Sequence, residues 1–322
     1  MQVISNPTQD EIKIAAQALK NGHLVSFPTE TVYGLGADAT NEKAVGKIYV
    51  AKGRPINHPV IVHISSANQL ENWAREIPDY AIKLGNAYWP GPMTLILKRN
   101  SRALDFITGG QENVGLRVPN QQVALALTRE FEKLGGFGIA APSANRFGSV
   151  SPTTVMAVEE ELEKFLESED LILDGGQCEI GVESSIIDCT QVNPVMLRPG
   201  AITKEMIEEV TGLTVSLKAD ESEIRASGLL DYHYAPKAKV FLGLIAQSGD
   251  GFIALDQIPT PIGSIRLASP ASIEDYARDL YGALRMGDQL GLDKIYVVEP
   301  EGPGLAIAIR DRLGKASWGN RS

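Results

Sequence analysis

Short apolar segments alternate with amphipathic segments along nearly the whole chain, and this alternation restricts the fold to the α/β class. The first amphipathic segment opens with the capping-box sequence Thr8-Gln9-Asp10-Glu11 and ends at Asn21-Gly22. An apolar segment at 23–27 follows and stops at Pro28. The pattern continues to about residue 216, which predicts a mixed α/β domain of roughly two hundred residues.

The remaining segments of this domain follow the same periodicities. We expect strands at 60–64, 94–98, 114–118, 138–141, 171–173 and 185–188, and helices at 41–51, 78–89 and 121–131. Pro152, directly after Ser151, is predicted to lie at the start of a further helix, where its missing N–H does no harm.

The periodicity fades between 216 and 239, where 218–223 is polar and charged. A second alternation then begins, with strands expected at 240–246, 251–255 and 294–298 and helices after 272 and at 305–313. This pattern predicts a small Rossmann-like α/β domain. The chain is therefore divided into a first domain at 1–216, a linker at 217–239 and a second domain at 240–322.

Charge and cysteine content restrict the function. The formal net charge of −10 argues against a broad contact with nucleic acid, which needs an excess of Lys and Arg on one face. Cys178 and Cys189 are too few for a thiolate zinc site or a disulfide scaffold, which fits a reducing cytoplasm. No signal peptide is expected at the N-terminus and no apolar run has the length of a membrane helix.

Two cations flank a glycine in Lys52-Gly53-Arg54-Pro55, at the end of an expected helix. The compact ammonium of Lys52 and the planar guanidinium of Arg54 would suit a polyphosphate if both lay on the same side of the chain. The same cations could instead complement the helix dipole. Both interpretations are open from the residues alone.

Small and polar residues gather in Ala140-Ala141-Pro142-Ser143-Ala144-Asn145, where Ser143 and Asn145 offer donors two residues apart. This is either a ligand-binding turn or an ordinary strand exit. Arg117 and Arg198 each end an apolar strand, and such arginines are either paired or line a cleft.

His63 stands in an apolar strand and is either a core residue or a catalytic one. His58 and the other histidines form no metal-ligand spacing, so no metal site made by the protein is predicted. The motifs G-x-S-x-G, H-E-x-x-H and G-x-x-x-x-G-K-[ST] do not occur, which leaves covalent and zinc chemistry unsupported.

The order of several motifs resembles that of the YrdC-like threonylcarbamoyl-AMP synthases. They are Pro28-Thr29-Glu30-Thr31-Val32-Tyr33-Gly34-Leu35-Gly36, Lys52-Gly53-Arg54-Pro55, Ala141-Pro142-Ser143-Ala144-Asn145, Gly181-Val182-Glu183-Ser184-Ser185 and Leu197-Arg198-Pro199-Gly200. His233-Tyr234-Ala235-Pro236-Lys237 and the region 240–322 resemble the longer, two-domain branch. The resemblance implies a YrdC-like twisted mixed sheet in the first domain.

The resemblance also implies residue roles. Residues that match threonine-site positions are Thr31, His63, Arg117, Ala141 and Ser184. Residues assigned to the ATP site are Lys52, Arg54, His58, Asn113, Ser143, Asn145, Ser151, Arg198 and Tyr234. Lys52 and Arg54 are the expected catalytic pair.

The reaction implied by the resemblance joins L-threonine, bicarbonate and ATP, with Mg²⁺, into threonylcarbamoyl-AMP and pyrophosphate. The product would pass to a tRNA threonylcarbamoyl-transferase. Two alternatives stay open, an RNA-binding YrdC-like module and a carbamoyl-transfer domain. The net charge speaks against the first and against direct tRNA binding. The shorter chain without zinc-finger segments speaks against the second.

The linker contains three consecutive ring residues, Tyr232 to Tyr234, which a simple spacer does not need. These rings either dock the linker on a domain or close it over the nucleotide as a lid that excludes water.

Overall fold

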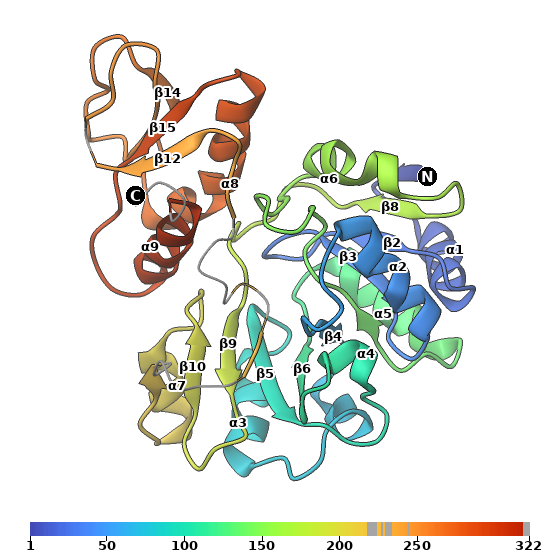
Figure 1. Ribbon diagram of the computed structural model, residues 1–322. Helices are drawn as coiled ribbons and strands as arrows, with labels where there is room; N and C mark the ends of the chain where they lie inside the picture. Colours follow the sequence, from blue (N-terminus) through green and yellow to red (C-terminus); the bar gives the residue numbers. More distant parts are fainter. Residues whose placement is uncertain (218–223, 227, 229–233, 244, 318–322) are drawn as a thin grey trace.

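The computed structural model describes residues 1–217, 224–226, 228, 234–243 and 245–317, and Tyr232 and His233 lie outside these residues. The described chain forms one 11-stranded mixed sheet and one 4-stranded parallel sheet, each with helices packed on it (Figure 1). The predicted fold class, a twisted mixed sheet plus a smaller Rossmann-like α/β domain, is confirmed.

The large sheet has the strand order β1-β8-β2-β3-β7-β4-β6-β5-β9-β10-β11. Its strands are β1 (Gln2–Ser5), β2 (Val25–Phe27), β3 (Gly34–Asp38), β4 (Ile61–His63), β5 (Met93–Lys98), β6 (Asn113–Arg117), β7 (Ile139–Ala140), β8 (Leu171–Asp174), β9 (Ser185–Asp188), β10 (Val195–Arg198) and β11 (Ser216–Leu217). The helices along this part are α1 (Gln9–Lys20), α2 (Glu42–Lys52), η1 (Ala67–Asn72), α3 (Asp79–Tyr88), α4 (Asp105–Thr108), α5 (Gln122–Lys133), α6 (Val155–Leu162), η2 (Glu163–Phe165) and α7 (Lys204–Thr211).

The amphipathic pattern of α1 shows why these segments fold as they do. Thr8 and Glu11 form the predicted capping box, with the Glu11 amide 3.4 Å from the Thr8 hydroxyl. Ile12 and Leu19 lie on the buried side of α1, in a core that α1 shares with α5 and with β2 and β8. A larger core, with residues from α2, α3, α6 and α7, contains Trp73 and Leu95.

The predicted helix start at Pro152 is wrong. The helix α6 begins at Val155, because Thr154 caps it and accepts a hydrogen bond from the Ala157 amide at 3.3 Å. The Pro152 carbonyl instead accepts a hydrogen bond from the Tyr33 amide at 2.9 Å. This proline therefore supports the segment before β3 rather than a helix.

The second sheet is parallel, with the order β12-β15-β13-β14. Its elements are β12 (Lys239–Leu242), β13 (Gly251–Ile253), β14 (Ile265–Ala268), α8 (Ile273–Gln289), β15 (Lys294–Val297) and α9 (Leu305–Ala316). The core of this domain also includes Val32, Val150 and Val182, so residues from the first part of the chain complete it.

The described part of the linker contacts residues that lie between the strands and helices of the first part of the chain. Arg225 donates to the carbonyls of Asn57 at 2.7 Å and Gly109 at 2.8 Å. Ala235 donates to the Gly148 carbonyl at 3.1 Å.

None of the helices in the described ranges combines the length and the apolar character needed to cross a bilayer.

Candidate active site

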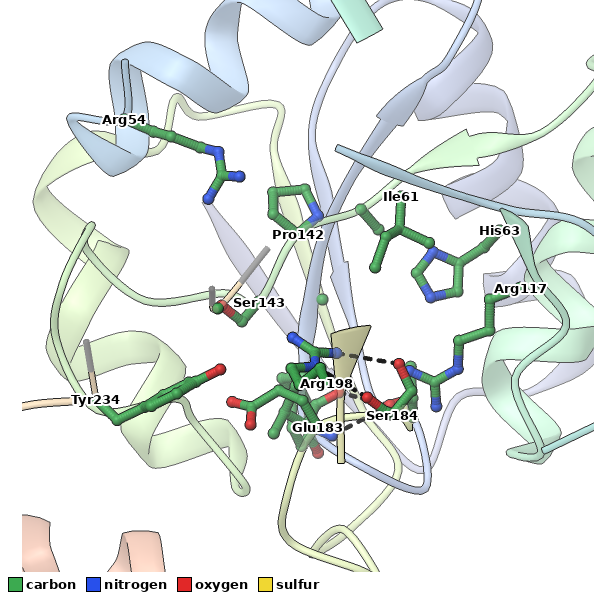
Figure 2. Close-up of a pocket in the computed structure, with 16 residues that line it drawn as sticks. Arg54, Ile61, His63, Arg117, Pro142, Ser143, Glu183, Ser184, Arg198 and Tyr234 are labelled. Atoms are coloured by element: carbon green, nitrogen blue, oxygen red, sulfur yellow. Dashed lines mark hydrogen bonds between the residues drawn. The ribbon is translucent and has the colours of Figure 1, made fainter. Parts of the chain in front are cut away.

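A cavity lies where loops and strand ends of the large sheet meet the connection to the second domain (Figure 2). Its lining comes from segments that are far apart in the sequence. The described lining residues are Thr29, Val32, Tyr33, Gly34, Arg54, Ile61, His63, Arg117, Ala141, Pro142, Ser143, Glu183, Ser184, Arg198, Gly228 and Tyr234.

Arg117 and His63 form one side of the cavity. β4 and β6 are parallel neighbours whose register pairs His63 with Arg117, and Figure 2 shows both side chains on the same side of the cavity. The Arg117 Nη2 lies 2.8 Å from Oε1 of Glu30, and both side chains are buried. The Arg117 Nε has no hydrogen-bond partner among the described residues, so this guanidinium can still bind an anion.

His63 is a neutral imidazole at ordinary pH. Burial, and then the nearby Arg117 charge, lower the pKa of His63 to about 3. Its Nδ1 is buried and has no hydrogen-bond partner in the described chain. A neutral histidine beside a cation can accept or donate a hydrogen bond without adding charge.

Arg54 and Ser143 lie on the other side of the cavity, where α2 ends and β7 leaves the sheet (Figure 2). The Arg54 Nη2 donates to the Pro59 carbonyl at 2.8 Å, and the guanidinium carbon lies 5.7 Å from the centre of the Phe147 ring. Burial lowers the pKa of Arg54 to about 10, which leaves it positively charged at neutral pH.

Arg198 occupies the centre of the cavity lining. Its Nε donates to the Ser184 carbonyl at 2.9 Å, and its Nη2 donates to the Ser184 hydroxyl oxygen at 3.1 Å (Figure 2). The Ser184 and Thr94 hydroxyls are 2.8 Å apart. Ser184 and Arg198 are therefore fixed together, so their positions relative to a ligand are coupled.

Lys52 lies behind the cavity lining. Its amine donates to the carbonyls of Ser143 at 2.6 Å and Asn145 at 2.5 Å. Burial, and then the Arg54 charge, hold the pKa of Lys52 well below its usual value. Gly53 has a left-handed φ of 61°, so the chain turns sharply between the two cations. Lys52 fixes the loop at 143–145, while Arg54 reaches the cavity.

The Glu183 carboxylate is held by three donors. The Ser151 hydroxyl donates to Oε1 at 2.6 Å, and both the Tyr281 hydroxyl and the Arg312 Nε donate to Oε2 at 2.9 Å. Burial opposes ionisation, but the charges of Arg312 and Arg198 and the hydrogen bond from Ser151 together lower the pKa of Glu183 to about 2. Glu183 is therefore ionised.

Tyr234 and Gly228 are the described linker residues that reach the cavity. Tyr234 is buried, with a left-handed φ of 63°, and Figure 2 shows its hydroxyl directed toward Glu183. A side chain at Gly228, whose φ is 76°, would collide with the Tyr234 hydroxyl.

The structure brings together Arg54, His63, Arg117, Ala141, Ser143, Ser184, Arg198 and Tyr234 in the lining. Other predicted residues stand behind it. Thr31 contacts the lining residue Thr29 through hydroxyls 2.8 Å apart, and the Asn145 amide donates to the Ser149 carbonyl at 2.8 Å.

His58 and Asn113 lie farther from the predicted site. The His58 ring packs against Phe147 with centroids 5.3 Å apart. Asn113 lines a second, smaller cavity with the linker residues Ile224 and Ala226. Ile61 lines both cavities, so this second cavity adjoins the first.

The sequence assigned no role to Thr29, Tyr33, Glu183 or Gly228, although all four line the cavity. Glu183 had a usable signal, because it is an acidic residue between apolar and small ones in Gly181-Val182-Glu183-Ser184-Ser185. Its partners Tyr281 and Arg312 had no such signal, since the carboxylate contacts them only after the two domains pack.

Mg²⁺ was expected with ATP, and it prefers carboxylate, phosphate and water oxygens. Glu183 is the one carboxylate among the described lining residues, and its oxygens already accept hydrogen bonds from Ser151, Tyr281 and Arg312. The lining does not form a magnesium cage by itself. It fits an ion that is held mainly by the phosphates of a nucleotide.

The fold and the cavity together define a two-domain α/β enzyme whose site carries several buried arginines. Comparison with known proteins agrees with this class. Residues 17–200 match the Sua5, YciO and YrdC family, described as "Telomere recombination", and residues 202–317 match "Threonylcarbamoyl-AMP synthase, C-terminal domain". The chain belongs to the threonylcarbamoyl-AMP synthase family, in its two-domain, Sua5-type branch.

Individual relatives extend over nearly the full length. Threonylcarbamoyl-AMP synthase from Pyrococcus abyssi is 40% identical, over 95% of this chain and 94% of the relative. The Bacillus subtilis protein of the same name is 40% identical, over 96% and 93%. The crystal structure of P. abyssi Sua5 complexed with L-threonine matches with a TM-score of 0.86 at 36% identity, over 98% of this chain and 97% of that one.

Proposed function

We propose that this chain is a nucleotidyltransferase that condenses L-threonine, bicarbonate and ATP into threonylcarbamoyl-AMP and pyrophosphate. The observation that carries the proposal is the placement of cations in one cavity. Arg117 lies on one side and Arg54 on the other, with Arg198 between them. Such a cavity suits two anionic substrates that must meet.

The threonine end of the cavity is assigned to Arg117 and its neighbours. The Arg117 guanidinium would bind the amino-acid carboxylate, and the neutral His63 would hold the polar part without adding charge. Ser184 would supply a hydroxyl to the substrate directly. Thr31 would act indirectly, because its hydroxyl contacts that of the lining residue Thr29. Ala141 would contact the methyl group, so serine should react more slowly because a methyl contact contributes roughly 1 kcal/mol.

The nucleotide end is assigned to Arg54, Arg198, Ser143 and Tyr234, which line the remaining cavity. Residues behind the lining would support these contacts rather than touch phosphate. They are Lys52, Asn145 and Ser151. His58, next to Phe147, and Asn113, in the adjoining cavity, would contact the parts of ATP that lie farther from the reacting phosphate.

The chemistry needs no enzymic nucleophile. The threonine amine attacks bicarbonate and releases water, which gives a carbamate. A carbamate oxygen then forms a bond to the α-phosphorus of ATP, and the bond to the bridging oxygen breaks as pyrophosphate leaves with its electron pair. Arg54 and Arg198 would stabilise that charge. Mg²⁺ that arrives with ATP would neutralise part of it.

We further propose the division into a catalytic domain at 1–216, a linker at 217–239 and a second domain at 240–322. Gly228 and Tyr234 support a linker that closes the nucleotide site. Threonylcarbamoyl-AMP is a mixed anhydride, and such compounds hydrolyse readily. We therefore also propose that it passes to a tRNA threonylcarbamoyl-transferase rather than accumulating in solution.

The test is to measure pyrophosphate release and threonylcarbamoyl-AMP by chromatography, with each substrate omitted in turn. We expect product only when threonine, bicarbonate and ATP are all present, and a slower rate with serine. Equal turnover in bicarbonate-free buffer, or equal rates with serine, would contradict the proposal.

A further inference from the structure

The loop that carries Glu183 is packed directly against the second domain. Gly181 has a left-handed φ of 79°, and a side chain there would collide with the backbone of α8 at Ala277 and Arg278. Val182, the next residue, lies in the core of the second domain with no exposed surface. The position of this loop is therefore set by α8 as well as by the large sheet.

Two side chains of the second domain hold the Glu183 carboxylate. The Tyr281 hydroxyl from α8 and the Arg312 Nε from α9 both lie 2.9 Å from Oε2. Arg312 also donates from Nη2 to the Glu183 carbonyl at 3.3 Å. The Arg312 side chain has no exposed surface, and it forms ion pairs with Glu183 and Asp311. These two carboxylates balance its buried charge.

The same two side chains hold Tyr234. The rings of Tyr234 and Tyr281 are stacked with centroids 5.7 Å apart, and the Arg312 guanidinium carbon lies 5.5 Å from the centre of the Tyr234 ring. One turn along α9, the Lys315 amine donates to the Gly228 carbonyl at 2.8 Å. Glu183, Gly228 and Tyr234, all lining residues, thus contact the second domain.

We propose that Tyr281 and Arg312 of the second domain are positioning residues for the reaction, which they serve by fixing Glu183 and Tyr234 at the nucleotide end of the cavity. This inference rests on the proposed function. Glu183 is an anion in a cavity that must accept phosphates, so it needs a fixed cation behind it. Without that support, the carboxylate would repel the phosphates and Tyr234 would lose its packing surface.

The first test substitutes Tyr281→Phe, which removes one hydroxyl and keeps the stacked ring. We expect the KM for ATP to rise about tenfold, because one hydrogen bond to a buried carboxylate is lost. The matched control is Tyr276→Phe in the same helix, whose hydroxyl donates to the Val298 carbonyl at 2.9 Å inside the second domain. The control should keep the parent KM.

The second test substitutes Arg312→Lys, which keeps the positive charge but removes the planar guanidinium that donates to Glu183 from two nitrogens. We expect weaker ATP binding by calorimetry, with a cooperative thermal transition retained. Its control is Arg310→Lys, two residues away on α9, where the side chain donates to the Pro300 carbonyl at 2.6 Å and the Gly302 carbonyl at 2.9 Å. A purely structural role would reduce the amount of folded enzyme and lower apparent kcat without changing KM or the affinity for ATP.

A double-mutant cycle tests the route through Glu183. If Tyr281 acts through this carboxylate, Tyr281→Phe should add little to the loss already caused by Glu183→Gln. Additive losses in the cycle, or parent-like KM and ATP affinity in both Tyr281→Phe and Arg312→Lys, would overturn the inference. A parent enzyme that fails to make threonylcarbamoyl-AMP would instead overturn the proposed function, so the two failures are distinct.

Discussion

His63 and Arg117 lie opposite each other in the register of two parallel strands, so a neutral imidazole and a guanidinium face the same end of the cavity. Parallel pairing brings together residues that are far apart in the sequence, at the carboxyl ends of β4 and β6. The charge difference between them follows from burial, because an imidazole loses its proton under conditions where a guanidinium keeps it.

Arg117→Lys should raise the KM for threonine more than the KM for ATP. Lysine keeps a cation near Glu30 but cannot form two parallel hydrogen bonds to a carboxylate, and charge-assisted bonds are worth about 1.5–3 kcal/mol. Steady-state kinetics with each substrate varied would measure this. The exposed Arg129→Lys in α5 serves as the control. An equal rise in both KM values would count against the threonine assignment.

His63→Gln should reduce the sensitivity of folding stability to acid. The pKa of His63 is about 3 in the folded chain, below its ordinary value of 6.5, so the unfolded chain takes up the proton first as the pH falls. The contribution of neutral His63 to the free energy of unfolding is fully present above the ordinary pKa of 6.5 and is lost as the pH falls toward 3. At pH 5 the loss is about 2 kcal/mol. Denaturant titrations at neutral pH and at pH 5 should show a smaller loss of unfolding free energy in the variant than in the parent. Identical losses would contradict the assignment.

Arg54→Ala should lower kcat/KM for ATP at least tenfold, the effect of about 1.4 kcal/mol, while the thermal midpoint changes little. The guanidinium lines the cavity and donates to the Pro59 carbonyl. Arg54→Lys should recover part of the activity. A variant that melts far below the parent would show that Arg54 serves the fold instead.

Lys52→Ala should behave differently from Arg54→Ala. Its amine binds the carbonyls of Ser143 and Asn145, so removal leaves two buried acceptors without this donor, at roughly 1–3 kcal/mol each. We expect a clear loss of unfolding free energy together with lost activity. Chemical denaturation of both variants side by side makes the comparison, and equal stabilities would refute the supporting role of Lys52.

A fragment of residues 1–216 should unfold cooperatively but at a lower temperature than the full chain. Its sheet and helices form a complete core, yet Val32, Val150 and Val182 lose the apolar surface of the second domain. Calorimetry of the fragment and the full chain would measure both points. A soluble fragment without any cooperative transition would contradict the boundary.

Much of this structure follows from local pattern. The capping box at Thr8 was predicted from its motif and is present at the start of α1. The strand 94–98 and the helix 121–131 were predicted from periodicity, and β5 and α5 have nearly the same bounds. β3 was not predicted, because Gly34-Leu35-Gly36 has little strand propensity and forms a strand only by pairing with β2 and β7.

Arg54 and Ser143, which were selected from their motifs, both lie in the lining of the cavity. The direction of the Lys52 side chain could not be predicted, because two cations around a glycine do not indicate which of them points into the cavity. The contact of Glu183 with Arg312 was also out of reach, since these residues are 129 positions apart and meet only across the domain interface.

The tight approach of Gly181 to α8 has a consequence for protein engineering. A chimera that joins residues 1–216 of this chain to the second domain of a relative must match the backbone of α8 to a loop that has no room for a side chain at Gly181. Transferring the loop 180–184 together with the second domain would preserve that fit. The two halves are best exchanged with a crossover in the large sheet before this loop, rather than within the linker.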